Sequence, residues 1–189
     1  MLTSILALFL ALAAAAPKEV KALIDNNRVT VREVTSSGKG TPIERRNNDL
    51  VAVDLIAKTA FFVPKGTAHG GSAHEILIDL KNVSIPPLPN KTAYPLAFPR
   101  EGVKKLVENN RVIVWDYTWT PGKPTVMHYH DKDVVVTYLA DGDLRSTTPE
   151  GKSDVNKISF GLVRFNAPDR SHFEELVKGA ARAIIVELK

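Results

Sequence analysis

The stretch PGKPTVMHYHDKDVVVTYLADG, residues 121–142, combines a strand pattern with two closely spaced histidines. Its valine-rich run lies between a Pro-Gly and an Asp-Gly pair, which is typical of a short β-strand bounded by turns. Side chains alternate between the two faces of a strand, so His128 and His130 are predicted to point to the same side. Two imidazoles on one strand face can share a metal ion.

If that face is the interior of a barrel, a third ligand has to come from another strand, and His172 is the only other histidine after residue 103. An all-histidine set suits one divalent transition metal (Fe, Mn, Ni, Cu or Zn) rather than Ca or Mg. Free imidazole takes up a proton near pH 6.5, so metal affinity is expected to fall below about that pH. The nearest carboxylates are Asp133 and Glu174, either of which can be a fourth ligand or an acid/base group. Glu174 shares strand parity with His172 and is the candidate catalytic residue.

The chain contains an internal repeat, because VKALIDNNRVTV (20–31) recurs as VKKLVENNRVIV (103–114). The ends of the repeats also match, HEILIDLK (74–81) with RAIIVELK (182–189). Short β-rich runs separated by turns predict an all-β fold of two barrels in tandem. The first barrel is expected to be smaller, since it has no counterpart of residues 141–160. We predict the boundaries as 1–16 for a signal peptide, 17–81 and 103–189 for the repeats, and 82–102 for a proline-rich linker.

On the run 111–119, Trp115, Tyr117 and Trp119 alternate onto one face. Such a face favours core or inter-repeat packing over a ligand platform.

Residues 121–142 resemble the first motif of the cupin superfamily, G-x5-H-x-H-x3-4-E-x6-G. Gly122, His128, His130 and Gly142 fall on the motif at its spacing, whereas its glutamate position falls on Val134 or Val135. The second motif is looser: Pro168 precedes His172 by four residues, Arg170 stands in place of glycine and Leu176 in place of asparagine. The second repeat is similar to small bacterial cupins of the conserved-barrel type. The resemblance implies two double-stranded β-helix (jelly-roll-like) barrels, with His128, His130 and His172 as metal ligands.

The first repeat has lost the corresponding metal motif, because Glu44 and Arg46 stand where His128 and His130 stand in the second. A guanidinium does not ligate a metal. The first repeat does keep Pro64-x-Gly66-x2-His69, so a remnant turn or a small-ligand pocket with Glu44 and Arg46 is expected there. Neither His69 nor His74 is expected to bind metal.

Residues 1–16, MLTSILALFLALAAAA, are apolar and end in small residues, which is typical of a secretory signal peptide. We therefore expect an exported protein, periplasmic or extracellular, with no stable membrane span after cleavage; an uncleaved N-terminal anchor is the alternative. The 189-residue chain has no cysteine, which excludes disulfides and thiolate metal sites. Its 25 basic and 21 acidic residues form no long run of like charge, so nucleic acid is not an expected partner.

The resemblance implies a mononuclear metal site that acts on a small organic molecule, either as a dioxygenase or as a Lewis acid in isomerisation or hydrolysis. The alternatives are a non-catalytic cupin that binds a small ligand or a metal, and a structural domain without ligand. The choice between enzyme and binding protein stays open, as does association into a homodimer.

Overall fold

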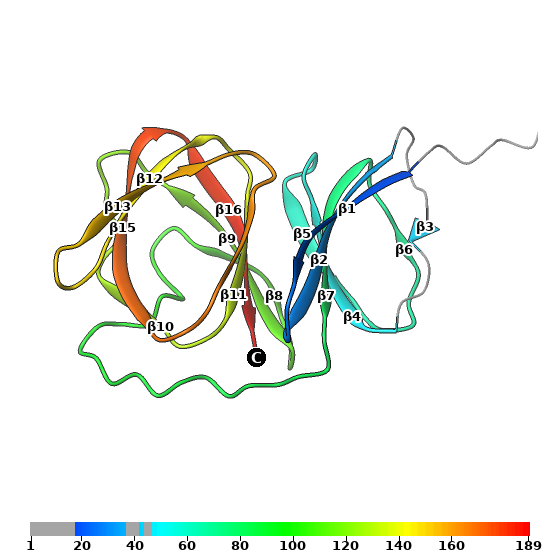
Figure 1. Ribbon diagram of the computed structural model, residues 1–189, viewed down its shortest axis with the longest axis horizontal. Coiled ribbons are helices and arrows are strands. Elements are labelled where there is room, and N and C mark those ends of the chain that lie inside the picture. The colour runs from blue at the N-terminus through cyan, green and yellow to red at the C-terminus, as the bar shows by residue number, and fades with distance from the viewer. Residues whose placement is uncertain (1–17, 37–41, 44–46) are drawn as a thin grey trace, which may run out of the picture.

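The computed structural model describes residues 18–36, 42–43 and 47–189, and within them the protein consists of β-strands in two barrels that lie side by side (Figure 1). The first barrel contains β1 (Lys18–Asp25), β2 (Val29–Ser36), β3 (Pro42–Ile43), β4 (Asp49–Asp54), β5 (Thr59–Val63), β6 (His69–Gly70) and β7 (His74–Leu80). The second contains β8 (Lys104–Glu108), β9 (Val112–Trp119), β10 (His128–His130), β11 (Val134–Tyr138), β12 (Gly142–Thr147), β13 (Ser153–Ile158), β14 (Val163–Asn166), β15 (Arg170–Gly179) and β16 (Ala181–Leu188). The predicted all-β fold is confirmed. The predicted signal peptide lies outside the described residues.

Each barrel is built on one five-stranded antiparallel sheet. The order is β1-β2-β7-β4-β5 in the first repeat and β14-β11-β16-β9-β8 in the second. The second barrel closes with a four-stranded sheet, β10-β15-β12-β13, whereas the described part of the first has only the two-stranded β3-β6 opposite its large sheet. The first barrel is therefore the smaller one, as expected from its missing hairpin.

The two five-stranded sheets pack face to face and form one shared core. Strand alternation places the β-branched residues of both repeats on the touching faces. The fully buried members include Val31, Val53, Ile76 and Ile78 from the first repeat and Val114, Val135, Ile184 and Val186 from the second. At about 25 cal/mol per Å² of buried apolar surface, this core is a principal source of stability, and it joins the repeats into one hydrophobic unit.

Reciprocal contacts across this core relate the repeats by an approximate two-fold axis. Arg28 Nε lies 3.5 Å from Asp133 Oδ2, and the equivalent Arg111 Nη1 lies 3.0 Å from Asp49 Oδ2. The Arg28 guanidinium also donates to the Lys189 carbonyl, as that of Arg111 does to a carbonyl of the first repeat. Asp133 is thus outside the cluster of metal-ligating histidines, and its carboxylate forms an ion pair with the other repeat.

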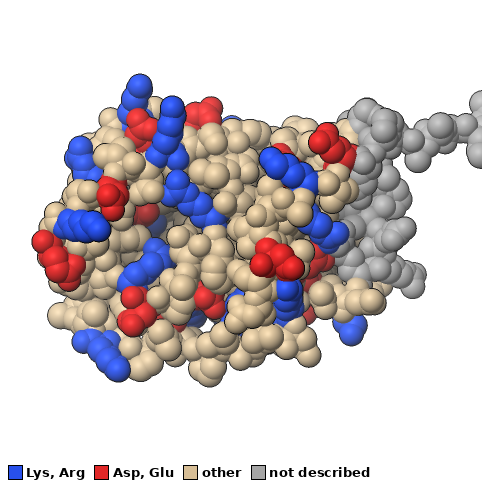
Figure 2. Space-filling view, viewed as in Figure 1, with Lys and Arg blue, Asp and Glu red and all other residues tan. Residues whose placement is uncertain are grey.

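Charges of both signs are mixed over the face of the molecule drawn in Figure 2, where lysine and arginine alternate with aspartate and glutamate. Within the described ranges, no helix is long and apolar enough to cross a membrane.

The last glycine of the motif, Gly142, is required by a close approach of backbone. A Cβ at this position would lie 2.4 Å from the Ala180 carbonyl oxygen and 2.7 Å from that of Lys178. Gly142→Ala is therefore expected to lower the free energy of unfolding by about 1–3 kcal/mol, as overpacking does elsewhere. Urea denaturation measures this, with Gly70→Ala as the control because its Cβ would meet nothing within 4 Å. Equal stability of the two variants would contradict the steric explanation.

Candidate metal centre

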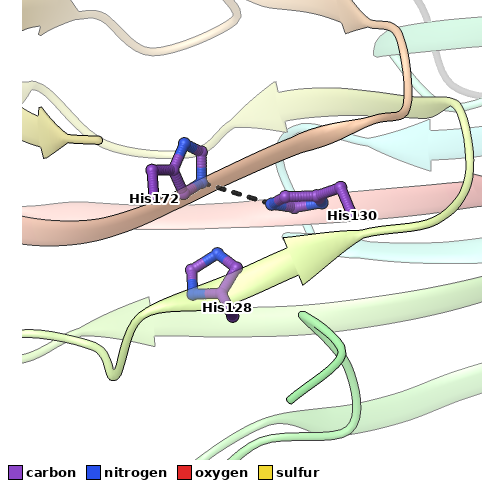
Figure 3. Close-up of side chains that lie close together, drawn as sticks. All are labelled: His128, His130 and His172. Atoms are coloured by element: carbon purple, nitrogen blue, oxygen red, sulfur yellow. Dashed lines mark hydrogen bonds between the residues drawn. The ribbon is translucent and has the colours of Figure 1, made fainter. Parts of the chain in front are cut away.

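Three histidines meet on neighbouring strands of the small sheet in the second barrel (Figure 3). His128 is the register partner of His172, and His130 follows two residues later on β10. The three rings form a nearly equilateral triangle, with centroid separations of 4.8–5.0 Å. One nitrogen from each ring lies within 4.8 Å of the others, and Nε2 of His130 is 3.2 Å from Nε2 of His172. The structure therefore brings together the three histidines that the sequence singled out.

The orientation of two of the rings is set by hydrogen bonds to the nitrogen that faces away from the triangle. His128 Nδ1 lies 2.8 Å from the Val126 carbonyl oxygen, to which it donates, so its Nε2 carries the lone pair. His172 Nδ1 lies 3.2 Å from Ser146 Oγ. His130 Nδ1 is buried and has no hydrogen-bond partner among the described residues. Such outer contacts are those that orient metal-binding imidazoles in proteins, and the residues present fit a transition metal ion.

Burial keeps the imidazoles neutral. It lowers the pKa of His128 from 6.5 to about 4, with the positive charge of Arg100 acting in the same direction. The pKa of His130 lies well below 6.5 for the same reason, assisted by Arg170, and burial also lowers that of His172. At neutral pH all three rings are therefore unprotonated, which is the form that binds a metal.

A cavity of about 170 Å³ opens beside the triangle and is lined by His130 and His172. One part of its wall is apolar and consists of Phe98, Trp119, Val134, Val136, Leu144 and Ile185. The remainder is polar and consists of Arg100, Tyr138, Ser146, Asn156, Arg164, Asn166, Arg170 and Glu174. Because this volume is below the ~300–1,000 Å³ of pockets for drug-sized ligands, the cavity suits a small molecule.

Arg100 is a site residue that the sequence did not indicate. The segment between β7 and β8 contains the predicted linker 82–102; it first runs along the lower side of the molecule in Figure 1 and then turns into the second barrel. Its Leu96 forms a parallel bridge with Tyr129 on β10. This contact carries Arg100 into the second barrel, where its side chain is only 10% exposed. Its Nη1 lies 3.4 Å from His128 Nε2. No spacing within the linker signals this role, because the contact depends on how residues 96 and 129 pair.

The aromatic face of β9 points into the second barrel rather than toward the first. Trp115, Tyr117 and Trp119 are all buried there, as the packing interpretation predicted. The Arg100 guanidinium lies over the Tyr117 ring at 4.0 Å and over the Phe98 ring at 4.7 Å, both favourable cation–π distances. Trp119 additionally lines the cavity, so one member of the face also belongs to the ligand site.

Glu174 lies at the cavity but outside the histidine cluster, which contains no carboxylate among the described residues. Its Oε2 accepts a hydrogen bond from Trp119 Nε1 at 3.1 Å and lies 3.6 Å from Arg100 Nη2. Burial by itself would raise the pKa of this carboxyl, but the charge of Arg100 and the hydrogen bond from Trp119 act in the other direction, and the pKa is lowered below 4.5. Glu174 is therefore ionised at neutral pH.

The remaining histidines pair with glutamates of the first repeat. His69 Nε2 lies 2.9 Å from the buried Glu75, and His74 Nε2 lies 2.8 Å from Glu33. Neither belongs to a cluster of three or more metal-ligating groups in the described part of the chain. Glu44 and Arg46 lie outside the described residues. Val134, at a position where the cupin motif has glutamate, lines the cavity with an apolar side chain.

No protein-family model matches the chain. The curated β-alanine degradation protein BauB of Pseudomonas aeruginosa is 47% identical over 45 residues, which are 24% of this chain and 47% of that protein. This chain thus matches about half the length of that relative.

Two solved structures are similar over almost the whole chain. AerE of Microcystis aeruginosa superposes with a TM-score of 0.60 at 9% identity, covering 95% of both chains. Oxalate decarboxylase of Bacillus subtilis, a protein with Mn(II) centres, gives 0.55 at 11% identity, covering 93% of this chain and 74% of its own. At such identities the likeness is one of fold. Together with the barrels and the histidine triangle, it shows that this chain has the tandem-barrel fold of the cupin superfamily.

Proposed function

We propose that His128, His130 and His172 hold one divalent transition metal ion, and that the second barrel acts on a small organic molecule bound beside it. The observation that carries the proposal is the convergence of three neutral imidazoles within 4.8 Å at the wall of a cavity. Fe, Mn, Ni, Cu and Zn all suit such a set, and any of them supplies a Lewis acid, with the redox-active ones also offering a site for O₂. The reaction class is accordingly that of a dioxygenase or of an isomerase or hydrolase.

Glu174 is our candidate for the residue that moves a proton. It is ionised, it lines the cavity, and Trp119 and Arg100 hold its Oε2. A carboxylate fixed in this way can accept a proton from a molecule in the cavity. We assign it the role of general base.

Glu174→Gln is expected to lower turnover by about 10²–10⁴-fold, because the amide keeps an acceptor for Trp119 but does not accept the substrate proton. Metal affinity should stay within a few-fold, since Glu174 is outside the ligand cluster. Glu175→Gln is the matched control, because Glu175 is the next residue in the chain, its carboxylate pairs with Arg145, and it does not line the cavity. Turnover and metal affinity are measured on the same preparations of each variant. Full turnover by Glu174→Gln would contradict the general-base role.

The proposal as a whole is tested by metal analysis of protein purified without a histidine tag, followed by reconstitution with each candidate metal. One metal per chain is expected, and two or none would overturn the proposal. Turnover is then sought with small organic acids, thiols and phenols, under O₂ and without it. The panel includes β-alanine because the similar protein BauB is named for its degradation.

A non-catalytic receptor for a small ligand is the alternative from another class. It predicts one metal and saturable ligand binding without product in any of these reactions.

For either function we propose an exported protein, on the basis of the apolar N-terminus. Sequencing of the mature N-terminus should start near Ala16 to Lys18, whereas an intact Met1 in the cytoplasmic fraction would contradict export.

A further inference from the structure

The cavity beside the histidines carries an excess of positive charge. Arg100, Arg164 and Arg170 line it, and Glu174 is the only carboxylate among its lining residues in the described part of the chain. Three guanidinium groups therefore face one acidic side chain, while the three histidines are neutral. A bound divalent metal would add two further positive charges to this site.

Arg100 and Arg164 lie on opposite sides of the second barrel. Arg100 enters from the linker, beside β10 at one edge of the small sheet. Arg164 lies on β14, and its Nη1 donates to Asn156 Oδ1 on β13 at 2.9 Å. β13 and β14 are edge strands of the two sheets, at the side of the barrel away from β10. The cationic groups are thus separated across the cavity, with one at each edge.

Arg170 lies beside the histidines, because it is the register partner of His130. Its charge and that of Arg100 both act on His130 and His172. The Arg164 guanidinium lies instead over the Tyr138 ring, 6.0 Å from the ring centroid. The cavity therefore has two cationic positions, one at Arg100, Arg170 and the histidines and one at Arg164.

The second position, Arg164, has no acidic partner among the described residues. Arg164 donates to Asn156 Oδ1 and to the Lys157 carbonyl. No carboxylate of the described residues forms a salt bridge with this guanidinium. A partly buried guanidinium without an anion is costly, and the fork of donors on arginine matches a carboxylate. This arrangement favours an anionic group of the ligand at that position.

From this charge distribution we infer that the ligand is a short organic anion with two acidic groups, one beside Arg100 and the histidines and the other at Arg164. The inference rests on the proposed function of the histidine site and names its substrate class. The first acidic group would offset the positive charge of the Arg100 guanidinium, whose Nη1 lies 3.4 Å from His128 Nε2, and that of a metal ion held by the histidines. The cavity of about 170 Å³ limits the ligand to a few carbon atoms.

The test is calorimetric titration of the Co²⁺-loaded and the metal-free protein at constant ionic strength. The probes are malonate and succinate as diacids, and propionate and β-alanine as acids with one carboxylate. The diacids are expected to bind at least about tenfold more tightly, since a second charge-assisted contact supplies that factor. Equal affinity for diacids and monoacids in both forms of the protein would overturn the inference.

Arg164→Gln separates the two positions. It should weaken diacid binding by about tenfold or more and change propionate binding less than about threefold, because propionate lacks the group that Arg164 contacts. Arg145→Gln is the matched control, as its side chain pairs with Glu175 and does not line the cavity. Thermal unfolding and Co²⁺ absorption are recorded for each variant. A protein that binds no Co²⁺ contradicts the proposed function, whereas a Co²⁺-loaded protein without diacid preference contradicts this inference alone; the metal-free titration tests the preference in either case.

Discussion

His172→Ala is expected to abolish binding of a divalent transition metal, with affinity falling by more than the ~10–100-fold that loss of an outer-shell partner costs. The physical reason is that His128 and His130 lie on one strand and His172 alone supplies the third nitrogen from β15. Two remaining imidazoles, with no carboxylate in the described ligand cluster, make a weak site. His128→Ala should behave in the same way. The measurement is competition with a chromophoric chelator for Zn²⁺ and Co²⁺ at pH 7.

The matched control is His69→Ala in the first barrel. His69 is buried, as His128 and His130 are, but its Nε2 lies 2.9 Å from Glu75 and it belongs to no ligand cluster in the described chain. Its removal should leave one metal per chain, although stability falls because Glu75 loses its partner. If His69→Ala lost the metal, or His172→Ala kept it, the assignment of the site to the second barrel would be wrong.

Lowering the pH from about 6.5 to about 4 is expected to destabilise the metal-free protein, with His128 alone contributing about 3 kcal/mol. Its pKa is 6.5 in the unfolded chain and about 4 in the folded protein, chiefly because it is buried. Between these values the unfolded chain binds the proton and the folded protein does not, so stability is complete above about 6.5 and is lost as the pH falls. Urea denaturation at a series of pH values measures the slope.

His128→Gln provides the comparison, because glutamine has no titratable group and the variant should show a shallower dependence on pH. An unchanged slope would contradict the assignment to His128.

The pH dependence of metal binding is affected by the same pKa shifts. The pKa of free imidazole led to the expectation, from the sequence, that metal affinity falls below about pH 6.5. With protons competing less well for the buried rings, the affinity for Co²⁺ should decline only closer to the lowered pKa values.

The strongest predictions from the sequence rested on local spacing and on the repeat. His128 and His130 share a strand face because their separation is two residues, whatever the rest of the chain does. The repeated segments predicted two related barrels in tandem, and the reciprocal ion pairs of Arg28 and Arg111 with the opposite repeat are contacts that the two barrels share. Asp133 is one of the two carboxylates nearest the motif, and its position there gave no sign that its partner lies 105 residues away, at Arg28.

Sequence by itself determined the all-β class, the duplication and the three histidines, because periodicity and repetition are properties of the chain that do not depend on long-range pairing. Only the tertiary structure decided what surrounds those histidines. Arg100 reaches His128 because the linker pairs with β10, and Arg164 reaches the cavity because β13 and β14 meet at the barrel edge. Charges that are scattered through the sequence become one cationic cavity only when the two sheets close over it, and that closure is a long-range event which no local pattern encodes.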